Sequence, residues 1–267
     1  MNSYPDLSQQ DSRSRTQPWT SFVLWLFLSL LAGLARVPYI MELTRAAGGV
    51  VDPIRLLSGI LSEHLFLPAI AICIALVLGP RVGLGFSGAR NTKGRWKSTL
   101  IYAAVCGVLV GAACAFMGGR LESSMISGVP DSARRVADVA RQMDPWKMAL
   151  ASFSAGLTEE LLFRAGAMTL FVWLIAKVIG RQPPGAGVLW LGNLLAAVLF
   201  GLAHLGNVAV LSVPITMSLI YYVTIVNGTA GIVFGWLYWR RGIGTAILAH
   251  VMADLVLKVI LPRLGPA

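Results

Sequence analysis

The side chains best suited to acid–base chemistry are few in the carboxyl-terminal part of the sequence, and all of them lie in apolar stretches. From Trp146 onward the chain contains three acidic residues and two histidines, which are Glu159, Glu160, Asp254, His204 and His250. Carboxylates and imidazoles act as general acids and bases when they are held near a reacting group. Their placement in apolar segments rather than in polar loops predicts that they form a buried functional site.

The first motif is the stretch GLTEELLFRAG, which contains the two adjacent glutamates. Glu160 and Arg164 are spaced i and i+4 with the acid on the amino-terminal side, the favourable order for an ion pair on a helix. Glu159 is rotated about 100° away from Glu160 and has no such partner on its own helix. An unpaired carboxylate in an apolar environment accepts a proton more readily, which suits a general base.

Two further motifs have the same spacing. His250 and Asp254, in AHVMAD, share one helical face and can act on one target. Phe200 and His204, in FGLAH, share a face of another helix. We expect Phe200 to form a wall of the pocket that His204 enters.

Ionisable side chains inside a membrane helix need a specific reason to be there. An Asp or Arg at the bilayer centre costs roughly 2.5–3.5 kcal/mol on insertion scales, so several of them facing lipid would be strongly unfavourable. We therefore expect these residues to face one another or a wet cavity, which makes a functional site the leading hypothesis. The alternative is a set of separate hydrogen bonds that only hold helices together.

The composition supports a membrane protein. Hydrophobic residues make up 56% of the chain and charged residues 13%, compared with about 25% charged residues in an ordinary soluble domain. The net charge is +10, but the basic residues collect between apolar segments, as in loops that face the anionic side of a bilayer. This pattern argues against a nucleic-acid partner and for the lipid bilayer.

Seven or eight apolar segments are long enough to be membrane helices. The candidates are Trp19–Val37, Leu65–Gly79, Thr99–Met117, Lys147–Ile179 (one long helix, or two with a break), Val188–Leu205, Leu219–Trp239 and Gly242–Leu261. A signal peptide is the competing interpretation of the first segment. We expect an all-α polytopic membrane protein with an intramembrane polar cavity. Residues 1–18 are expected to be a disordered polar tail and residues 19–267 a single membrane domain, with the motif-bearing core at 146–262.

The loops indicate an orientation. The stretch from Arg81 to Lys97 carries five basic residues and no acid, so the positive-inside rule places it, and with it the amino terminus, in the cytoplasm. We therefore expect a multi-pass protein of the cell (inner or plasma) membrane. Between the third and fourth spans, the stretch SARRVADVARQM has apolar residues at helical spacing. It predicts an amphipathic helix, either at the membrane interface or on a solvated loop.

Other polar or sulfur-containing residues have simpler interpretations. The three cysteines lie in apolar runs without a C-x-x-C spacing, so we expect buried, reduced packing residues at Cys73, Cys106 and Cys114. Asn193 lies within a membrane helix and predicts an interhelical hydrogen bond. Glu63 and His64 are expected at the water-exposed end of the second span.

The three motifs, in this order and each on a membrane helix, resemble the CPBP family of intramembrane endopeptidases. That family includes the type II CAAX prenyl endopeptidases and bacterial relatives linked to bacteriocin processing and self-immunity. The resemblance covers about Trp146 to Leu261 and rests on the pattern E-E-x-x-x-R, F-x-x-x-H and H-x-x-x-N/D, here Glu159-Glu160 with Arg164, Phe200 with His204, and His250 with Asp254.

The resemblance implies a roughly eight-helix fold with a conical, water-containing cavity open to the cytosolic side, and hydrolysis of a peptide bond. By this resemblance Glu159 and His204 would activate a water molecule. His250 and Asp254 would stabilise the tetrahedral oxyanion. Glu160 and Arg164 would support the site.

One residue departs from the prenyl endopeptidases, which have asparagine where this chain has Asp254. Asparagine donates a hydrogen bond to an oxyanion, whereas an ionised aspartate cannot. Asp254 must then be protonated, or must orient His250 instead. Zinc binding is a third option, because histidines and carboxylates are competent ligands. The chain has no H-E-x-x-H motif, so the water-activating glutamate is favoured and no cofactor is expected.

The sequence thus favours an intramembrane endopeptidase that acts on a membrane-associated peptide or protein. A non-catalytic immunity or scaffold protein with the same fold is the alternative, followed by a zinc-dependent protease and a proton-coupled transporter. A transporter predicts acids along a path across the bilayer. In the carboxyl-terminal half the acids are confined to two predicted helices instead.

Overall fold

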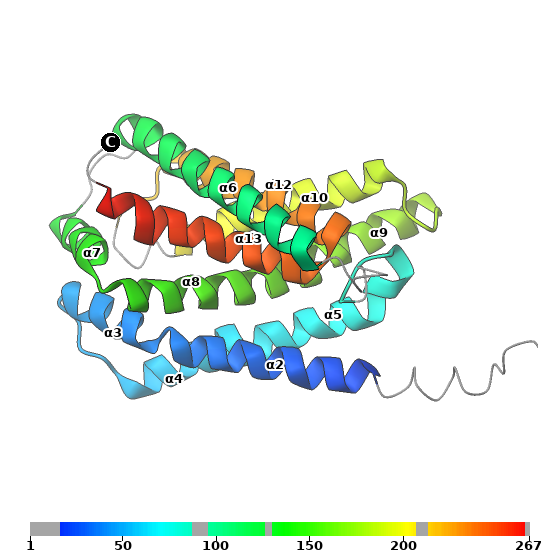
Figure 1. The fold of residues 1–267 in the computed structure, drawn as a ribbon, viewed down its shortest axis with the longest axis horizontal. Helices are drawn as coiled ribbons and strands as arrows, with labels where there is room; N and C mark the ends of the chain where they lie inside the picture. The colour runs from blue at the N-terminus through cyan, green and yellow to red at the C-terminus, as the bar shows by residue number, and fades with distance from the viewer. Residues whose placement is uncertain (1–16, 87–95, 126–129, 207–212, 265–267) are drawn as a thin grey trace, which may run out of the picture.

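The protein is all-α over the residues that the structure describes (Figure 1). The structure is a computed structural model and describes residues 17–86, 96–125, 130–206 and 213–264. These ranges contain no strand and seven helical stretches long and apolar enough to cross a membrane, namely Pro18–Ala46, Pro53–Val82, Trp96–Arg120, Pro145–Ile179, Ala186–Ala203, Met217–Arg241 and Ile243–Arg263. The expectation of an all-α, multi-pass membrane protein is confirmed. Residues 1–16 of the expected polar tail lie outside the described residues.

The first two spans run in opposite directions along the long axis of the molecule (Figure 1). Helix α2 (Gln17–Ala35) leads into α3 (Val37–Ala46). The chain returns through α4 (Pro53–Leu61), the π-helical segment η1 (Ser62–Phe66) and α5 (Leu67–Val82). The second span is therefore one continuous helix that contains the π-helical segment η1.

Local chemistry fixes both ends of this second span. Asp52 caps its start, because the carboxylate Oδ1 accepts a hydrogen bond from the backbone N–H of Ile54 at 2.9 Å, and Pro53 occupies the first turn. The span ends at Gly83, whose φ of +72° lies in the left-handed region that favours glycine.

Two helices of different character follow. Helix α6 (Trp96–Met125) is a long span, and α7 (Asp131–Gln142) is short and amphipathic. The α7 side chains of Ala133 and Val136 are buried. Helix α7 packs on α3 at one end of the bundle (Figure 1). The predicted helix over this segment is confirmed.

The motif-bearing part starts with a continuous helical stretch. Helix α8 (Pro145–Glu160) runs through the π-helical segment η2 (Leu161–Met168) into α9 (Thr169–Ile179). The choice between one long helix and two is thus answered by one helix whose turns widen directly after Glu160. Helices α10 (Ala186–Ala203) and α12 (Met217–Arg241) follow and pack against each other.

The last span lies at the centre of the packing. Helix α13 (Ile243–Leu255) continues as the π-helical η3 (Val256–Ile260) and the short 3-10 helix η4 (Leu261–Arg263). It packs against α6, α8 and α12.

Glycines on α6 allow its close approach to α13. A Cβ atom at Gly107 would lie 2.6 Å from the carbonyl oxygen of Ala249, and one at Gly111 would lie 2.7 Å from that of Ala253. Small residues that let backbones touch are typical of helix contacts in membranes. They hold the helix that carries His250 and Asp254 close to its neighbour.

The outer faces of the spans are apolar. Helix α2 exposes a row of large hydrophobic side chains, Val23, Leu24, Phe27, Leu31 and Leu34. Such a continuous apolar surface is suited to lipid. Cys73 lies on an outer face of α5 and is exposed, so the expectation of burial is wrong for Cys73, whereas Cys114 is buried; all three cysteines are free thiols.

Candidate active site

The two adjacent glutamates at the end of α8 have different surroundings. The Glu160 side chain is fully buried, and its Oε2 lies 3.1 Å from Nε of the equally buried Arg164. The ion pair predicted from the i, i+4 spacing is therefore confirmed. Glu159 is 28% exposed and forms no ion pair on its own helix. Glu159 is thus the more exposed of the two glutamates.

Aromatic rings and a hydrogen-bond chain hold Arg164 in place. Its guanidinium carbon lies 4.8 Å from the ring centre of Phe200 and 5.9 Å from that of Phe234. The Thr169 hydroxyl donates to the Arg164 carbonyl oxygen at 3.2 Å. Tyr238 then donates to the Thr169 hydroxyl oxygen at 2.8 Å. These contacts tie η2 to α10 and α12 and so fix the position of the Glu160–Arg164 pair.

His204 comes from a different span and turns one ring nitrogen toward Glu159. It follows directly after α10, and its Nδ1 lies 2.8 Å from the carbonyl oxygen of Phe200. A carbonyl oxygen can only accept, so Nδ1 carries a proton and Nε2 of the neutral ring is a free acceptor. Nε2 lies 3.9 Å from Oε2 of Glu159.

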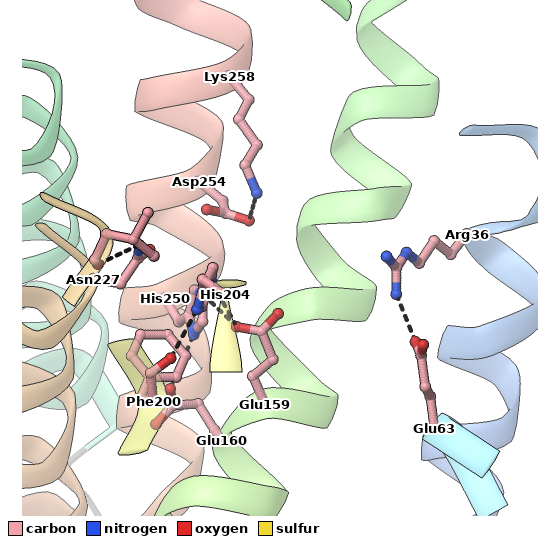
Figure 2. Close-up of polar contacts among 11 residues, drawn as sticks. Arg36, Glu63, Glu159, Glu160, Phe200, His204, Asn227, His250, Asp254 and Lys258 are labelled. Carbon is pink, nitrogen blue, oxygen red and sulfur yellow. Dashed lines mark hydrogen bonds and ion pairs between the residues drawn. The ribbon is translucent and has the colours of Figure 1, made fainter. Parts of the chain in front are cut away.

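His250, from α13, lies between the two glutamates (Figure 2). Its Nδ1 lies 2.9 Å from Oε1 of Glu160, and its Nε2 lies 3.7 Å from Oε2 of Glu159. The carboxylate of Glu160 accepts a hydrogen bond from the Nδ1–H group of His250, and this bond fixes the orientation of the imidazole. Asp254 was one candidate for this orienting role, but Glu160 fills it.

The rings of two phenylalanines pack against the two histidines. The Phe200 ring packs edge-on against His204 at 4.8 Å and against His250 at 5.9 Å, measured between ring centres. Phe200 thus contacts both histidines, and its role as a pocket wall stays a prediction. Phe234 of α12 stacks on His250 at 4.7 Å with an angle of 16° between the rings. Sequence reasoning missed Phe234, since a phenylalanine in an apolar helix carries no distinguishing signal.

Asp254 has an ion-pair partner that sequence reasoning also missed. Lys258, on η3, places its Nζ 2.5 Å from Oδ2 of Asp254. The lysine is spaced i+4 from the aspartate, so the spacing alone was a usable signal. Asp254 therefore lies one turn from His250 and pairs with Lys258, one turn further along the same helical face.

His64 is buried rather than interfacial, so the expectation for this residue is wrong. It is 3% exposed, its ring fills space left by Gly33, and its Nδ1 lies 3.0 Å from the hydroxyl of Thr158. Thr158 directly precedes Glu159, so the second span contacts α8 beside the candidate base. The neighbouring Glu63 is exposed and pairs with Arg36 at 3.0 Å.

The π-helical segments coincide with these polar contacts. In the described part of the chain, η1 carries His64, η2 carries Arg164 and η3 carries Lys258. Such segments occur frequently at functional sites. The predicted interhelical hydrogen bond of Asn193 is confirmed, because its amide Nδ2 donates to the Ile232 carbonyl oxygen at 3.0 Å.

The structure thus brings most of the proposed residues into one cluster, which we call the Glu-His cluster and define as Glu159, Glu160, His204 and His250. Arg164 and Phe200 pack against it, whereas Asp254 adjoins it with Lys258 (Figure 2). Among the described residues, no group of three or more histidine, cysteine, aspartate or glutamate side chains is arranged to hold a metal ion. The cluster combines a partly exposed carboxylate, an imidazole acceptor and a second imidazole anchored by a buried ion pair.

Comparison with known protein families gives a match that covers the motif-bearing part of the chain. Residues 141–256 match the family model described as Type II CAAX prenyl endopeptidase Rce1-like. Searches of curated proteins and of solved structures gave no significant match. The matched residues contain all three motifs and every member of the Glu-His cluster. Residues 141–256 of the chain therefore form a type II CAAX prenyl endopeptidase Rce1-like domain.

Proposed function

We propose that the chain is a membrane-embedded endopeptidase that hydrolyses a peptide bond in a membrane-associated peptide or protein. One observation carries the proposal: Oε2 of Glu159 lies 3.9 Å from Nε2 of His204 and 3.7 Å from Nε2 of His250. The three side chains come from three different spans, so their proximity is a product of the fold and not of local sequence.

Glu159 and His204 have the geometry to activate a water molecule together. Their separation of 3.9 Å is too long for a direct hydrogen bond. It leaves both groups within hydrogen-bond reach, about 2.8 Å, of a common oxygen atom. The carboxylate of Glu159 then takes a proton from the water as its oxygen attacks the peptide carbonyl, and the unprotonated Nε2 of His204 orients the same water. As the tetrahedral intermediate collapses and the C–N bond breaks, Glu159 gives this proton to the leaving amine nitrogen.

His250 is suited to the oxyanion that forms on the carbonyl oxygen. The Nδ1–H group of His250 already donates a hydrogen bond to Glu160. For Nε2 to donate a hydrogen bond as well, it must also carry a proton, and the ring is then a positively charged imidazolium. Glu159 and Glu160 flank that ring with two carboxylates and stabilise its positive charge. A fixed cation aimed at developing negative charge is the common form of oxyanion stabilisation. We propose that Asp254, one helical turn from His250, also lies beside the oxyanion.

We further propose that the protein is a single membrane domain of the cell membrane with a cytoplasmic amino terminus. The support is the set of seven candidate spans and the stretch from Arg81 to Lys97, which holds five basic residues and no acid.

The test is cleavage by the purified protein reconstituted in liposomes. The probe is a library of peptides, each with an apolar anchor and a fluorogenic cleavable segment. Glu159→Gln removes the base and should lower kcat by about 10²–10⁴-fold. The matched control is Glu42→Gln, because Glu42 lies on α3 and pairs with Lys147 at 2.6 Å, outside the Glu-His cluster. Thermal unfolding should show that both variants are folded.

Each result separates the candidate functions. Cleavage that is lost in Glu159→Gln and kept in Glu42→Gln supports the endopeptidase. Equal turnover by the wild type and Glu159→Gln would contradict it. Peptide binding by the wild type without any cleavage would favour an immunity or scaffold protein with this fold.

A further inference from the structure

The last turn of α8 carries three polar side chains in succession, and two of them are held by other spans. Successive side chains of an α-helix point about 100° apart. Glu160 is held from one side, with its Oε1 2.9 Å from Nδ1 of His250. Thr158 is held by a different span, since its hydroxyl oxygen lies 3.0 Å from Nδ1 of His64. Glu159 lies between these two anchored residues.

The Glu159 carboxylate depends on the backbone of this turn for its position. Its contacts with His204 and His250, at 3.9 and 3.7 Å, are longer than hydrogen bonds. The turn is also where the α-helix ends, because the π-helical segment η2 begins at Leu161 and has a different hydrogen-bond pattern. A regular α-helix therefore supports the turn on its amino-terminal side only.

The contact between His64 and Thr158 is buried. His64 is 3% exposed and Thr158 is 5% exposed. A polar group left without its partner away from water is costly, so the hydrogen bond favours a single arrangement of the two side chains. The ring of His64 also fits closely against Gly33 of α2, because a Cβ atom at that position would lie 2.7 Å from Cγ of His64.

The segment that carries His64 is itself anchored. Glu63, the preceding residue of η1, pairs with Arg36 at 3.0 Å. Figure 2 shows this pair on the side of α8 away from His250. Helix α2 packs against both η1 and α8, and α13 packs against α8 as well. The first two spans therefore hold one side of α8, and the span that carries His250 holds the other.

We propose that His64 is a positioning residue of the site, which acts through Thr158. The hydrogen bond fixes the rotation of the last turn of α8, and this rotation sets the distance from the Glu159 carboxylate to His204. His64 does not touch the reacting atoms. A displacement of a catalytic group by about 1 Å can cost about 10²-fold in rate, so the contact should affect kcat more than substrate binding. This role rests on the proposed peptidase function.

The test compares two variants of equal size at position 64, on cleavage of the anchored peptides by the full-length protein in liposomes. Asparagine carries polar atoms on Cγ, as histidine carries Nδ1, whereas leucine has methyl groups there. His64→Leu removes the hydrogen bond to Thr158 and should lower kcat by about 10–10²-fold with little change in KM. His64→Asn keeps a hydrogen-bonding atom in that place and should retain most of the wild-type kcat.

Position 158 offers the same comparison from the other side of the contact. Thr158→Val removes the hydroxyl and should lower kcat to a similar extent, whereas Thr158→Ser keeps the hydroxyl and most of the activity. The double variant His64→Leu/Thr158→Val removes one and the same hydrogen bond, so it should be no slower than the slower single variant. The two variants at position 158 also decide the question where His64→Leu does not fold.

Asn193→Leu is the matched control, because it removes another interhelical hydrogen bond of 3.0 Å by an exchange of similar size. Asn193 lies about three helical turns from His204 and outside the Glu-His cluster. The substitution should lower the melting temperature and leave kcat unchanged.

Three results would overturn the inference and leave the endopeptidase proposal standing. In the first, His64→Leu and His64→Asn are equally slow. In the second, His64→Leu has a lower melting temperature but an unchanged kcat, so the contact only stabilises the fold. In the third, the single losses of kcat multiply in the double variant. A wild-type protein that cleaves none of the peptides would refute the endopeptidase proposal and this inference with it.

Discussion

The buried ion pair of Glu160 and Arg164 predicts a large loss of stability when one charge is removed alone. The two groups lie 3.1 Å apart, and neither side chain is exposed. Arg164→Met keeps the apolar stem but deletes the cation, so the carboxylate of Glu160 is left buried with His250 as its remaining partner. The variant also loses the contact between the guanidinium and the Phe200 ring at 4.8 Å.

The expected magnitude follows from these contacts. Breaking a buried ion pair from one side costs about 3–5 kcal/mol, because a charge is left without compensation. A loss of about 4 kcal/mol corresponds to roughly a 10³-fold fall in the ratio of folded to unfolded protein. The double variant Glu160→Gln/Arg164→Met removes both charges, and the new amide oxygen can still accept the His250 Nδ1 proton. Its loss should therefore be smaller than the sum of the two single losses by about 0.5–3 kcal/mol.

The assay is reversible unfolding of the purified protein in mixed micelles with increasing denaturing detergent, which yields the free energy of unfolding. The wild type, both single variants and the double variant complete the cycle. The reasoning is refuted if Arg164→Met stays within about 1 kcal/mol of the wild type, the range of an ordinary substitution. Additive single losses would refute it equally, because the two charges would then be independent.

Two further predictions concern the helix contacts that position the site. Gly111→Val should lower the free energy of unfolding by about 1–3 kcal/mol, because a Cβ atom there meets the Ala253 carbonyl oxygen at 2.7 Å. Gly119→Val, on the same helix but with no atom within 4 Å of the added Cβ, is the control and should cost much less. Thr158→Val removes the hydroxyl 3.0 Å from Nδ1 of buried His64 and should cost about 1–3 kcal/mol by detergent unfolding. No loss in Thr158→Val would show that this contact does not stabilise the fold.

Local sequence patterns predicted the spans and one contact of the site. Long apolar runs identify membrane helices because the bilayer sets their length. The Glu160–Arg164 pair follows from spacing on a single helix, so it too was predictable. The same argument left Glu159 without a partner on its own helix, which is what the structure shows.

Beyond the Glu160–Arg164 pair, sequence reasoning did not identify which polar side chains of the site pair with each other. The shared face of His250 and Asp254 predicts that the two act together, but His250 bonds to Glu160 of α8 and Asp254 to Lys258. His64 is near the start of an apolar segment, where a polar residue is usually interfacial. It is buried because Gly33 of the first span leaves room for its ring. The positions of the π-helical segments likewise depend on packing and are not visible in the apolar pattern.

The central claim is that Glu159 and His204 act on one and the same water molecule. Residues that act as a unit lose activity non-additively. The most direct measurement is therefore kcat for cleavage of an anchored peptide by the wild type, Glu159→Gln, His204→Gln and the double variant, all shown to be folded. We predict that the double variant is no slower than the slower single variant. Single losses that multiply in the double variant would contradict a shared water molecule and, with it, the proposed mechanism.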